Sequence, residues 1–160
     1  IGAHVEIGNR EVVAWDQPMV RSAQEGLMGF IVKKIDGIYH FLVQAKLESG
    51  NFDVVELAPT VQCLTGNYRK GKNEYLIPYL EEVLNAPKER IWYSSYQSEE
   101  GGRFFQEQNL NTIVEVGDEF PIEVDENYCW MTLNQMLSFV TYNNYLNIAA
   151  RSLLAAISFY

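Results

Sequence analysis

Three polar side chains, Gln44, Lys46 and Glu48, alternate with apolar residues in HFLVQAKLESGN, residues 40–51. In an extended strand alternate side chains face opposite sides, so an amide, an ammonium and a carboxylate share one face. Such a face either meets water, as one side of an antiparallel sheet often does, or lines a pocket. In a pocket, a carboxylate can move a proton and an ammonium can stabilise an oxyanion.

A second stretch, APTVQCLTGNY at residues 58–68, also places polar groups where packing alone does not require them. Thr60 and Gln62 share a strand face, and Asn67 and Tyr68 follow in a loop. A Thr/Gln pair of this kind is most often a solvated strand face. The alternative is a set of hydrogen-bonding groups for a polar ligand.

A third stretch, YQSEEGGRF at residues 96–104, combines an acid with a base. Gln97 and Glu99 share a strand face, and Arg103 lies just past a glycine pair. Glu99 and Arg103 form either a surface ion pair, which contributes little to stability, or part of a site. Near the N-terminus, Trp15 is either packed beside a turn or a stacking platform.

The pattern along the chain predicts elements that position these residues. Residues 29–48 form a hairpin with its turn at Asp36-Gly37, and residues 52–64 supply further strand with a bulge or edge at Pro59. A helix is predicted over residues 77–87, with acidic residues early. Residues 91–116 are predicted to form two strands around a turn at Gly101-Gly102, and residues 119–130 a short extended piece.

The last thirty residues predict two helices. In the first, Thr132 and Gln135 form a capping box, and the predicted buried face consists of Leu133, Met136, Leu137 and Val140. In the second, Asn147 is the cap and Leu153, Leu154 and Ile157 face inward. The sum is an α+β fold: a mixed sheet with helices packed against it, as one domain over residues 1–160.

Composition excludes several classes of protein. The net charge of -9 argues against a nucleic-acid binder, which needs a broad basic surface. No apolar run reaches the roughly 18 residues of a membrane span, so we expect no membrane insertion and a cytoplasmic location. Two cysteines without ligand spacing predict reduced thiols. No phosphate-binding glycine loop, dinucleotide fingerprint, zinc motif or glutamate-rich pyrophosphohydrolase box is present.

A series of motifs resembles the NDP-hexose 2,3-dehydratase family over about Trp15 to Ile157. In order they are WDQPMV, EGLMGFIV, HFLVQAKLESGN, LAPTVQCLTGNY, YQSEEGGRF, WMTLNQML and NIAARSLLAAI. The resemblance implies a Nudix-like fold and removal of water across C2 and C3 of a nucleotide-linked 4-keto-6-deoxyhexose, expected to be thymidine-linked. It implies no metal and no redox cofactor. Family members usually contain two tandem copies of the unit.

The resemblance also implies site residues. Glu99 is the expected base, Lys46 the stabiliser of the enolate, Glu48 an acid or orienting group, and Arg103 the partner of the diphosphate. Trp15 or Tyr68 is expected to stack on the base of the nucleotide. The remaining substrate-binding residues expected are Gln17, Gln44, Thr60, Gln62, Asn67, Gln97, Ser98, Asn109 and Asn111.

The sequence departs from the family pattern at three positions. Gln108 and Leu110 stand where arginines are expected, and Ala149 stands where an aspartate is expected. The rival interpretation is therefore a non-catalytic nucleotide-sugar-binding or structural domain of the same family. Because one copy of the unit is present, either two chains pair as a homodimer or the chain is part of a longer protein.

Overall fold

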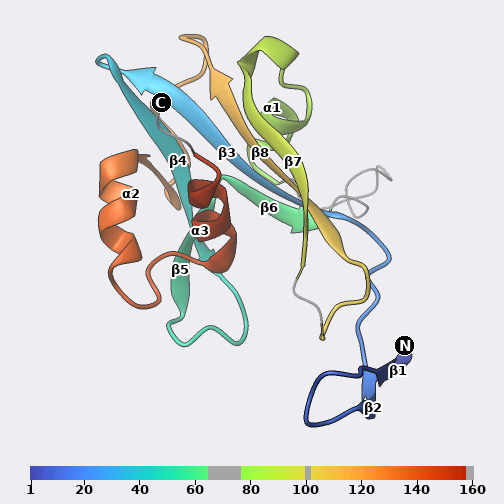
Figure 1. Ribbon diagram of the computed structural model, residues 1–160. Helices are drawn as coiled ribbons and strands as arrows, with labels where there is room; N and C mark the ends of the chain where they lie inside the picture. The colour runs from blue at the N-terminus through green and yellow to red at the C-terminus, as the bar shows by residue number, and fades with distance from the viewer. Residues whose placement is uncertain (65–76, 100–101, 158–160) are drawn as a thin grey trace.

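One mixed sheet forms the body of the computed structural model, which describes residues 1–64, 77–99 and 102–157 (Figure 1). In these residues the strand order is β5-β4-β3-β8-β7, with β6 paired to β3 and β9 paired to β4. The strands are β3 (Gly26–Ile35), β4 (Ile38–Leu47), β5 (Val55–Pro59), β6 (Val61–Leu64), β7 (Ile91–Ser98), β8 (Gln108–Val116) and β9 (Tyr128–Thr132).

The β3–β4 hairpin turns where the sequence predicts. Asp36 and Gly37 adopt φ values of 48° and 82°, the left-handed conformation that a two-residue hairpin turn requires and that glycine tolerates best. Beyond the turn β3 pairs antiparallel with β4, so Ile31 lies opposite Leu42. The first half of β3 pairs with β6, and β8 runs parallel to β3. Strand β3 is therefore the centre of the sheet.

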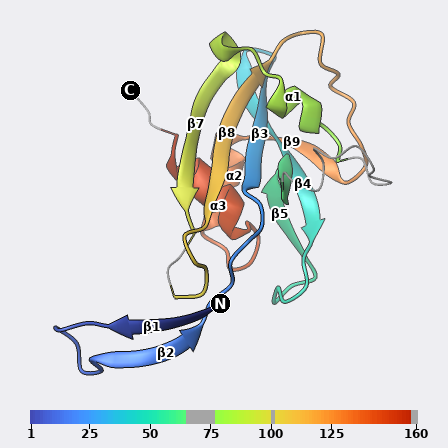
Figure 2. The same cartoon turned by 90° about the vertical axis from the view of Figure 1, so that its right-hand side faces the viewer.

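Two helices cover one face of the sheet and a third covers the other (Figure 2). Helices α2 (Leu133–Val140) and α3 (Ile148–Ala155) pack on one core cluster, and α1 (Leu80–Leu84) packs on the second. The first cluster contains Phe30, Val32, Phe41, Val43, Ile113, Met131, Met136, Leu146, Ala150, Leu153 and Leu154. The second contains Leu27, Ile31, Leu42, Val61, Leu80, Val83, Val114, Phe120 and Tyr128.

Both predicted helix caps are present, but the predicted buried face of α2 is partly wrong. Met136 is fully buried and Leu133 packs beside it, whereas Leu137 and Val140 are 43% and 46% exposed. Helix α2 lies at the edge of the sheet over β4 and β9, so only a narrow stripe of its surface is covered. The predicted inward residues of α3 are confirmed, with Leu153 and Leu154 buried and Ile157 packed against them.

Helix α1 is shorter than its predicted range. Tyr79 has a φ of 63°, outside the helical region, so the helix begins at Leu80 and Pro78 lies before it. A single 3-10 turn, Lys88–Arg90, then leads into β7. Strands β7 and β8 are antiparallel as predicted. Strand β7 ends at Ser98 and β8 begins at Gln108, so the connection between them is long.

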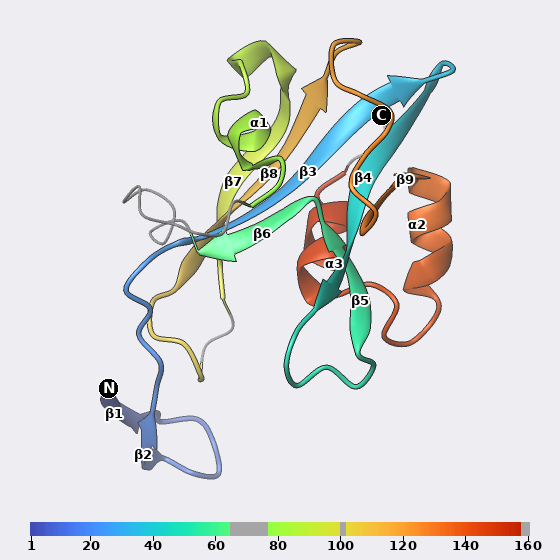
Figure 3. The same cartoon turned by 180° about the vertical axis from the view of Figure 1, so that it is seen from behind.

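A small hairpin of β1 (Gly2–Glu6) and β2 (Ala14–Pro18) projects from the body (Figure 3). The sequence pattern predicts no strand in this segment. Two residues beyond β2, Val20 bonds to the β7–β8 connection, from Val20 N to Arg103 O at 2.7 Å and from Phe105 N to Val20 O at 2.8 Å. Both cysteines are free, and no helix in the described part of the chain is long and apolar enough to cross a membrane.

Candidate functional site

The three polar stretches meet at one end of the sheet. Strand β7 runs antiparallel to β8, so the end of β7 lies beside the beginning of β8, and β6 pairs with the beginning of β3. The end of β4 pairs with β5, and Lys46 and Glu48 reach β6 through their contacts with Gln62. Glu48 and Glu99 follow the ends of β4 and β7, and Asn109 and Asn111 lie at the start of β8. The strand neighbours, which the sequence does not specify, thus bring separate motifs to one edge.

Four amide side chains share one face at this end, and we call them the amide patch: Gln62, Gln97, Asn109 and Asn111. Gln62 and Asn111 both lie opposite Met28, and Asn109 lies opposite Gln97. Since residues paired across a sheet point to the same side, all four face the side on which Met28 packs against the α2–α3 cluster. Two strand spacings separate Gln62 from Asn111, about 10 Å between backbones.

Asn109 ties the patch to one of the candidate acids. Its Oδ1 accepts the backbone N–H of Gly26 at 2.9 Å, and its Nδ2 donates to Glu99 Oε1 at 2.5 Å. A Cβ at position 26 would collide with Asn109 Oδ1, so this approach requires glycine. Gln97 donates to the hydroxyl of Tyr93 at 2.6 Å. Glu99 is therefore held in place by an amide of the patch.

Asn111 carries an unused acceptor. It is 3% exposed, and its Nδ2 donates to the backbone oxygen of Asn109 at 3.0 Å. Its Oδ1 accepts no hydrogen bond from any described residue. A buried acceptor without a partner costs about 1–3 kcal/mol, so its position favours a ligand that brings a donor such as a hydroxyl.

Lys46 and Glu48 form the other side of the site, next to Gln62. Lys46 Nζ lies 3.8 Å from Glu48 Oε1 and donates to the backbone oxygen of Gln62 at 3.0 Å. Gln62 Nε2 donates to Glu48 Oε1 at 3.1 Å. The two charged side chains are 22% and 36% exposed. This end of the polar face of β4 is thus a partly enclosed, hydrogen-bonded group and not a freely solvated row.

Two predicted site residues serve the fold. Gln44 Nε2 donates to the backbone oxygen of Pro59 at 2.8 Å, and Thr60 is fully buried. The Thr60 hydroxyl accepts from Ile31 N at 2.9 Å and donates to Leu42 O at 2.5 Å, so it joins β3 to β4. Both side chains stabilise the crossing from β5 to β6.

The remaining predicted residues lie around the β7–β8 connection. Arg103 is exposed with its guanidinium 5.6 Å from the ring centre of Phe104. Gln17 donates to the backbone oxygen of Gly102 and accepts from Trp15 Nε1 at 2.5 Å, so the hairpin tryptophan is tethered near Arg103. Ser98 is exposed at the end of β7. Asn67 and Tyr68 lie outside the described residues.

Asn147, which the sequence indicates only as a helix cap, also contacts the candidate site. Its Oδ1 accepts the backbone N–H of Ala150 at 2.9 Å, and its Nδ2 donates to Gln62 Oε1 at 2.7 Å. The residue is 3% exposed. The capping pattern reveals the first contact, whereas the second joins positions 85 residues apart and has no local signal.

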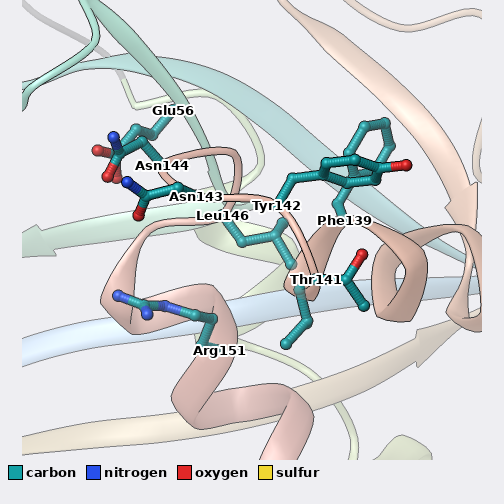
Figure 4. Close-up of a pocket in the computed structure, with 9 residues that line it drawn as sticks. Glu56, Phe139, Thr141, Tyr142, Asn143, Asn144, Leu146 and Arg151 are labelled. Atoms are coloured by element: carbon teal, nitrogen blue, oxygen red, sulfur yellow. The ribbon is translucent and has the colours of Figure 1, made fainter.

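A separate pocket of about 360 Å³ lies beside the segment between α2 and α3 (Figure 4). Arg151 extends on the side of Glu56 and Asn144, and the rings of Phe139 and Tyr142 lie on the other side. None of the predicted site residues lines it. Its volume is at the lower end of small-molecule sites, and its single cation makes it a second place to test for an anionic ligand.

Electrostatics in the site are local. Burial raises the pKa of the Cys63 thiol to about 11, while the charge of Lys46 acts in the opposite direction. Cys63 therefore reports on the charge of the Lys46 ammonium. No group of three or more His, Cys, Asp or Glu side chains within residues 1–64, 77–99 and 102–157 is placed to hold a metal ion.

The fold belongs to the Nudix-like class. A solved ADP compounds hydrolase superposes with a TM-score of 0.55 at 18% identity, covering 96% of this chain and 80% of the other. A Nudix hydrolase from M. smegmatis, RenU, matches with a TM-score of 0.47 at 11% identity, covering 96% of this chain and 91% of that one. At these identities the likeness concerns the fold alone.

The family follows from the sequence comparisons. The family model for NDP-hexose 2,3-dehydratase matches residues 1–157, so the chain belongs to this family. Two curated relatives, from Streptomyces violaceoruber and Saccharopolyspora spinosa, are 43% and 41% identical over 157 residues, 98% of this chain. Both are named dTDP-4-dehydro-6-deoxy-alpha-D-glucopyranose 2,3-dehydratase. The chain spans only 35% and 32% of their lengths.

Proposed function

We propose that the chain is a sugar-nucleotide 2,3-dehydratase, or the part of one that holds its polar site. The proposed substrate is a thymidine-linked 4-keto-6-deoxyhexose, the class named for the relatives. The observation that carries the proposal is the polar end of the sheet, where Asn111 Oδ1 needs a donor between two groups that contain acids.

The proposed reaction uses the acidity that the 4-keto group gives to the C3 proton. Glu99 removes that proton, and the ammonium of Lys46 stabilises the negative charge that develops on the 4-oxygen. The C2–O bond then breaks, and the hydroxyl leaves as water with the proton carried by Glu99. The product is the C2–C3 enol, so atoms and charge balance without an oxidant or reductant.

For Glu48, the contacts favour the orienting role over the acid role. Its carboxylate lies 3.8 Å from the Lys46 ammonium and accepts an N–H from Gln62, so it serves as an acceptor in both contacts. A carboxylate held in this way can fix the ammonium in place. Gln44 and Thr60 would then contribute to the site only by fixing the strands that carry these groups.

Arg103 is the proposed partner of the diphosphate. Among the described residues no carboxylate pairs with it, and a guanidinium fork matches phosphate oxygens. Trp15, tethered by Gln17 to Gly102, is the proposed stacking partner of the nucleotide base. Since Arg103 and Glu99 both lie in the β7–β8 connection, the diphosphate and the sugar would occupy neighbouring positions.

Calorimetric titration with thymidine diphosphate tests this placement. We expect saturable binding that Arg103→Ala abolishes and that Lys46→Ala, which removes a contact to the sugar, leaves largely unchanged. Arg151→Ala is the matched control, because Arg151 is an exposed arginine in the separate pocket. Binding that Arg151→Ala abolishes and Arg103→Ala preserves would move the anion site to that pocket. Conversion of the 4-keto sugar is then measured directly.

The non-catalytic alternative rests on the three departures from the family pattern. Leu110 packs against the α1 cluster, on the opposite face from Asn109 and Asn111, so its side chain takes no part in the amide patch. Ala149 is buried in the first turn of α3. If a folded chain binds no thymidine diphosphate, the structural role takes precedence.

We also propose that two copies of the chain pair. Large apolar side chains are exposed around the β4–β5 connection and between α2 and α3, and Leu57 N donates to Tyr145 O at 2.8 Å where these segments meet. The exposed members are Leu47, Phe52, Val54, Val55, Tyr142, Tyr145 and Ile148. A patch of this kind is typical of an interface. Sedimentation that shows a stable monomer at micromolar concentration would contradict the pairing.

A further inference from the structure

A chain of hydrogen bonds runs from the N-terminus of α3 to the carboxylate of Glu48. The N–H of Ala150 donates to Asn147 Oδ1 at 2.9 Å, and Asn147 Nδ2 donates to Gln62 Oε1 at 2.7 Å. Gln62 Nε2 then donates to Glu48 Oε1 at 3.1 Å, and Lys46 Nζ lies 3.8 Å from the same oxygen. Each member of this chain has its donor and acceptor ends in a fixed order.

The order is set at the helix. A backbone N–H only donates, so the atom of Asn147 that faces Ala150 must be the oxygen, and the other end of the amide must be the NH₂ group. That NH₂ group requires an acceptor, so Gln62 must turn its oxygen toward Asn147. Gln62 is then left with its NH₂ group facing Glu48. The orientation of two amides follows from a single backbone donor.

We infer that Asn147 is a positioning residue, which acts through the amide of Gln62 to hold the carboxylate of Glu48 aligned with the ammonium of Lys46. An N–H that faces a carboxylate favours its charged form, whereas a carbonyl oxygen in the same place disfavours it. The inference rests on the proposed function, because it assigns Glu48 a role in that site. The side chain that caps α3 thus also fixes the hydrogen-bond partner of the Glu48 carboxylate.

Replacing Asn147 with aspartate reverses the donor–acceptor order of these hydrogen bonds without removing the helix cap. Aspartate is as good a cap as asparagine, and its charge is favourable at a helix N-terminus, so α3 keeps its first turn. Its second oxygen accepts where Nδ2 donated, so Gln62 must rotate its amide by half a turn. The oxygen of Gln62 then faces Glu48. Asn147→Ser keeps a capping oxygen but leaves Gln62 free to take either orientation.

The titration of the Glu48 carboxyl is the direct measurement. Carbon-13 NMR of protein labelled at glutamate carboxyls, with the Glu48 signal assigned from Glu48→Gln, follows it without any need for turnover. In Asn147→Asp we expect the midpoint to rise by about one pH unit, and in Asn147→Ser by less. The titratable groups described around this site are Lys46, 3.8 Å from Glu48, Cys63 on β6, whose pKa responds to Lys46, and Glu56 on β5, opposite Lys46.

A double-variant comparison separates this relay, the effect transmitted through rotation of the Gln62 amide, from the direct electrostatic effect of the new aspartate on Glu48. In the Gln62→Ala background, Asn147→Asp should no longer raise the midpoint, because no amide remains to rotate. A rise that persists undiminished in that background would show a through-space effect and overturn the inference, as would an unchanged midpoint in Asn147→Asp alone. A shifted titration in a protein without dehydratase activity would instead retain the relay and reject the proposed function.

In an active protein the Asn147 variants should change kcat but not KM. Asn147→Asp should lower kcat several-fold with KM unchanged, and the acidic limb of the kcat profile should move to higher pH by the NMR shift. A residue with a purely structural role would lower the amount of folded protein and leave the position of that limb unaltered. An unmoved limb alongside a shifted NMR midpoint would exclude Glu48 from the kinetically important ionisation.

Discussion

The two C-terminal helices begin in similar ways but have different relations to the rest of the molecule. Thr132 and Gln135 at the start of α2 bond to each other in a closed capping box, all within four residues of sequence. Asn147 at the start of α3 uses only one end of its amide for the helix and donates with the other to Gln62. A cap that satisfies its own polar groups stabilises one helix, whereas a cap with a spare donor links its helix to a distant strand.

The largest effect expected from this difference concerns Glu48, where the link from Asn147 ends. Glu48→Gln should lower kcat by about 10²-fold, because the ammonium of Lys46 loses the carboxylate that holds it in place. In the Glu48→Gln background Asn147→Ser should then have no further effect on kcat. Steady-state kinetics on the 4-keto sugar measure both. Glu82→Gln, at an exposed carboxylate on α1, is the matched control. An equal loss of kcat in that variant would contradict the role assigned to Glu48.

A second effect concerns the packing that holds α2, which does not depend on the site. Met136 is fully buried in the α2–α3 cluster, so Met136→Ala should lower the free energy of unfolding by about 2–5 kcal/mol. Leu137→Ala, one residue further along the same helix and 43% exposed, should cost under about 1 kcal/mol. Urea denaturation provides both values. Equal losses would mean that α2 packs on the face predicted from its periodicity.

A third, smaller effect compares the two caps directly. Thr132→Ala and Asn147→Ala should each lower the free energy of unfolding by about 1 kcal/mol, the usual cost of a lost cap. Only Asn147→Ala should also lower kcat, because only Asn147 donates to Gln62. Thermal unfolding and kinetics on the same preparations separate the two. A fall in kcat of equal size in Thr132→Ala would show that both helices affect the site only through stability.

The features predicted correctly from sequence are those with local causes. The Asp36-Gly37 turn, the Thr132–Gln135 box and the Asn147 cap are each specified within a few residues. The buried face of α2 was half wrong because periodicity gives the stripe of a helix but not the width of the surface it meets. The family resemblance supplied the fold, which strand patterns alone leave open.

The arrangement of the site has the same limit. Strand parity shows that Gln97 and Glu99 share a face, and that Asn109 and Asn111 do. It does not show that Gln62 and Asn111 lie on either side of Met28, because this depends on which strands are neighbours. Nor does parity distinguish Thr60, whose hydroxyl joins two strands in the core, from Gln62, which contacts Glu48. Only the three-dimensional structure therefore distinguishes the polar residues of a motif that stabilise the fold from those that line the candidate site.

The two free cysteines lie near the two regions compared above, so the reactivity of their thiols can be used to probe each region. Cys63 follows Gln62 on β6, and Cys129 lies on β9, the strand that leads into α2. Burial raises the pKa of Cys63 from an ordinary 9.0 to about 11, so at pH 8 its reactive thiolate is scarce. The unfolded chain loses this proton first as pH rises, so the contribution to stability is full below pH 9.0 and is lost as pH rises to about 11.

The smallest effect follows from the charge of Lys46, which lowers the pKa of Cys63 against the larger influence of burial. Lys46→Ala should raise that pKa further and slow alkylation of Cys63 by iodoacetamide a few-fold at pH 8, measured in a Cys129→Ser background. In a Cys63→Ser background the same substitution should leave the reactivity of Cys129 unchanged, because burial and not the charge of Lys46 raises the pKa of Cys129. Faster alkylation of Cys63 would mean that Lys46 shields the thiol sterically, and the ammonium would then not be the charge that its contacts with Glu48 and Gln62 indicate.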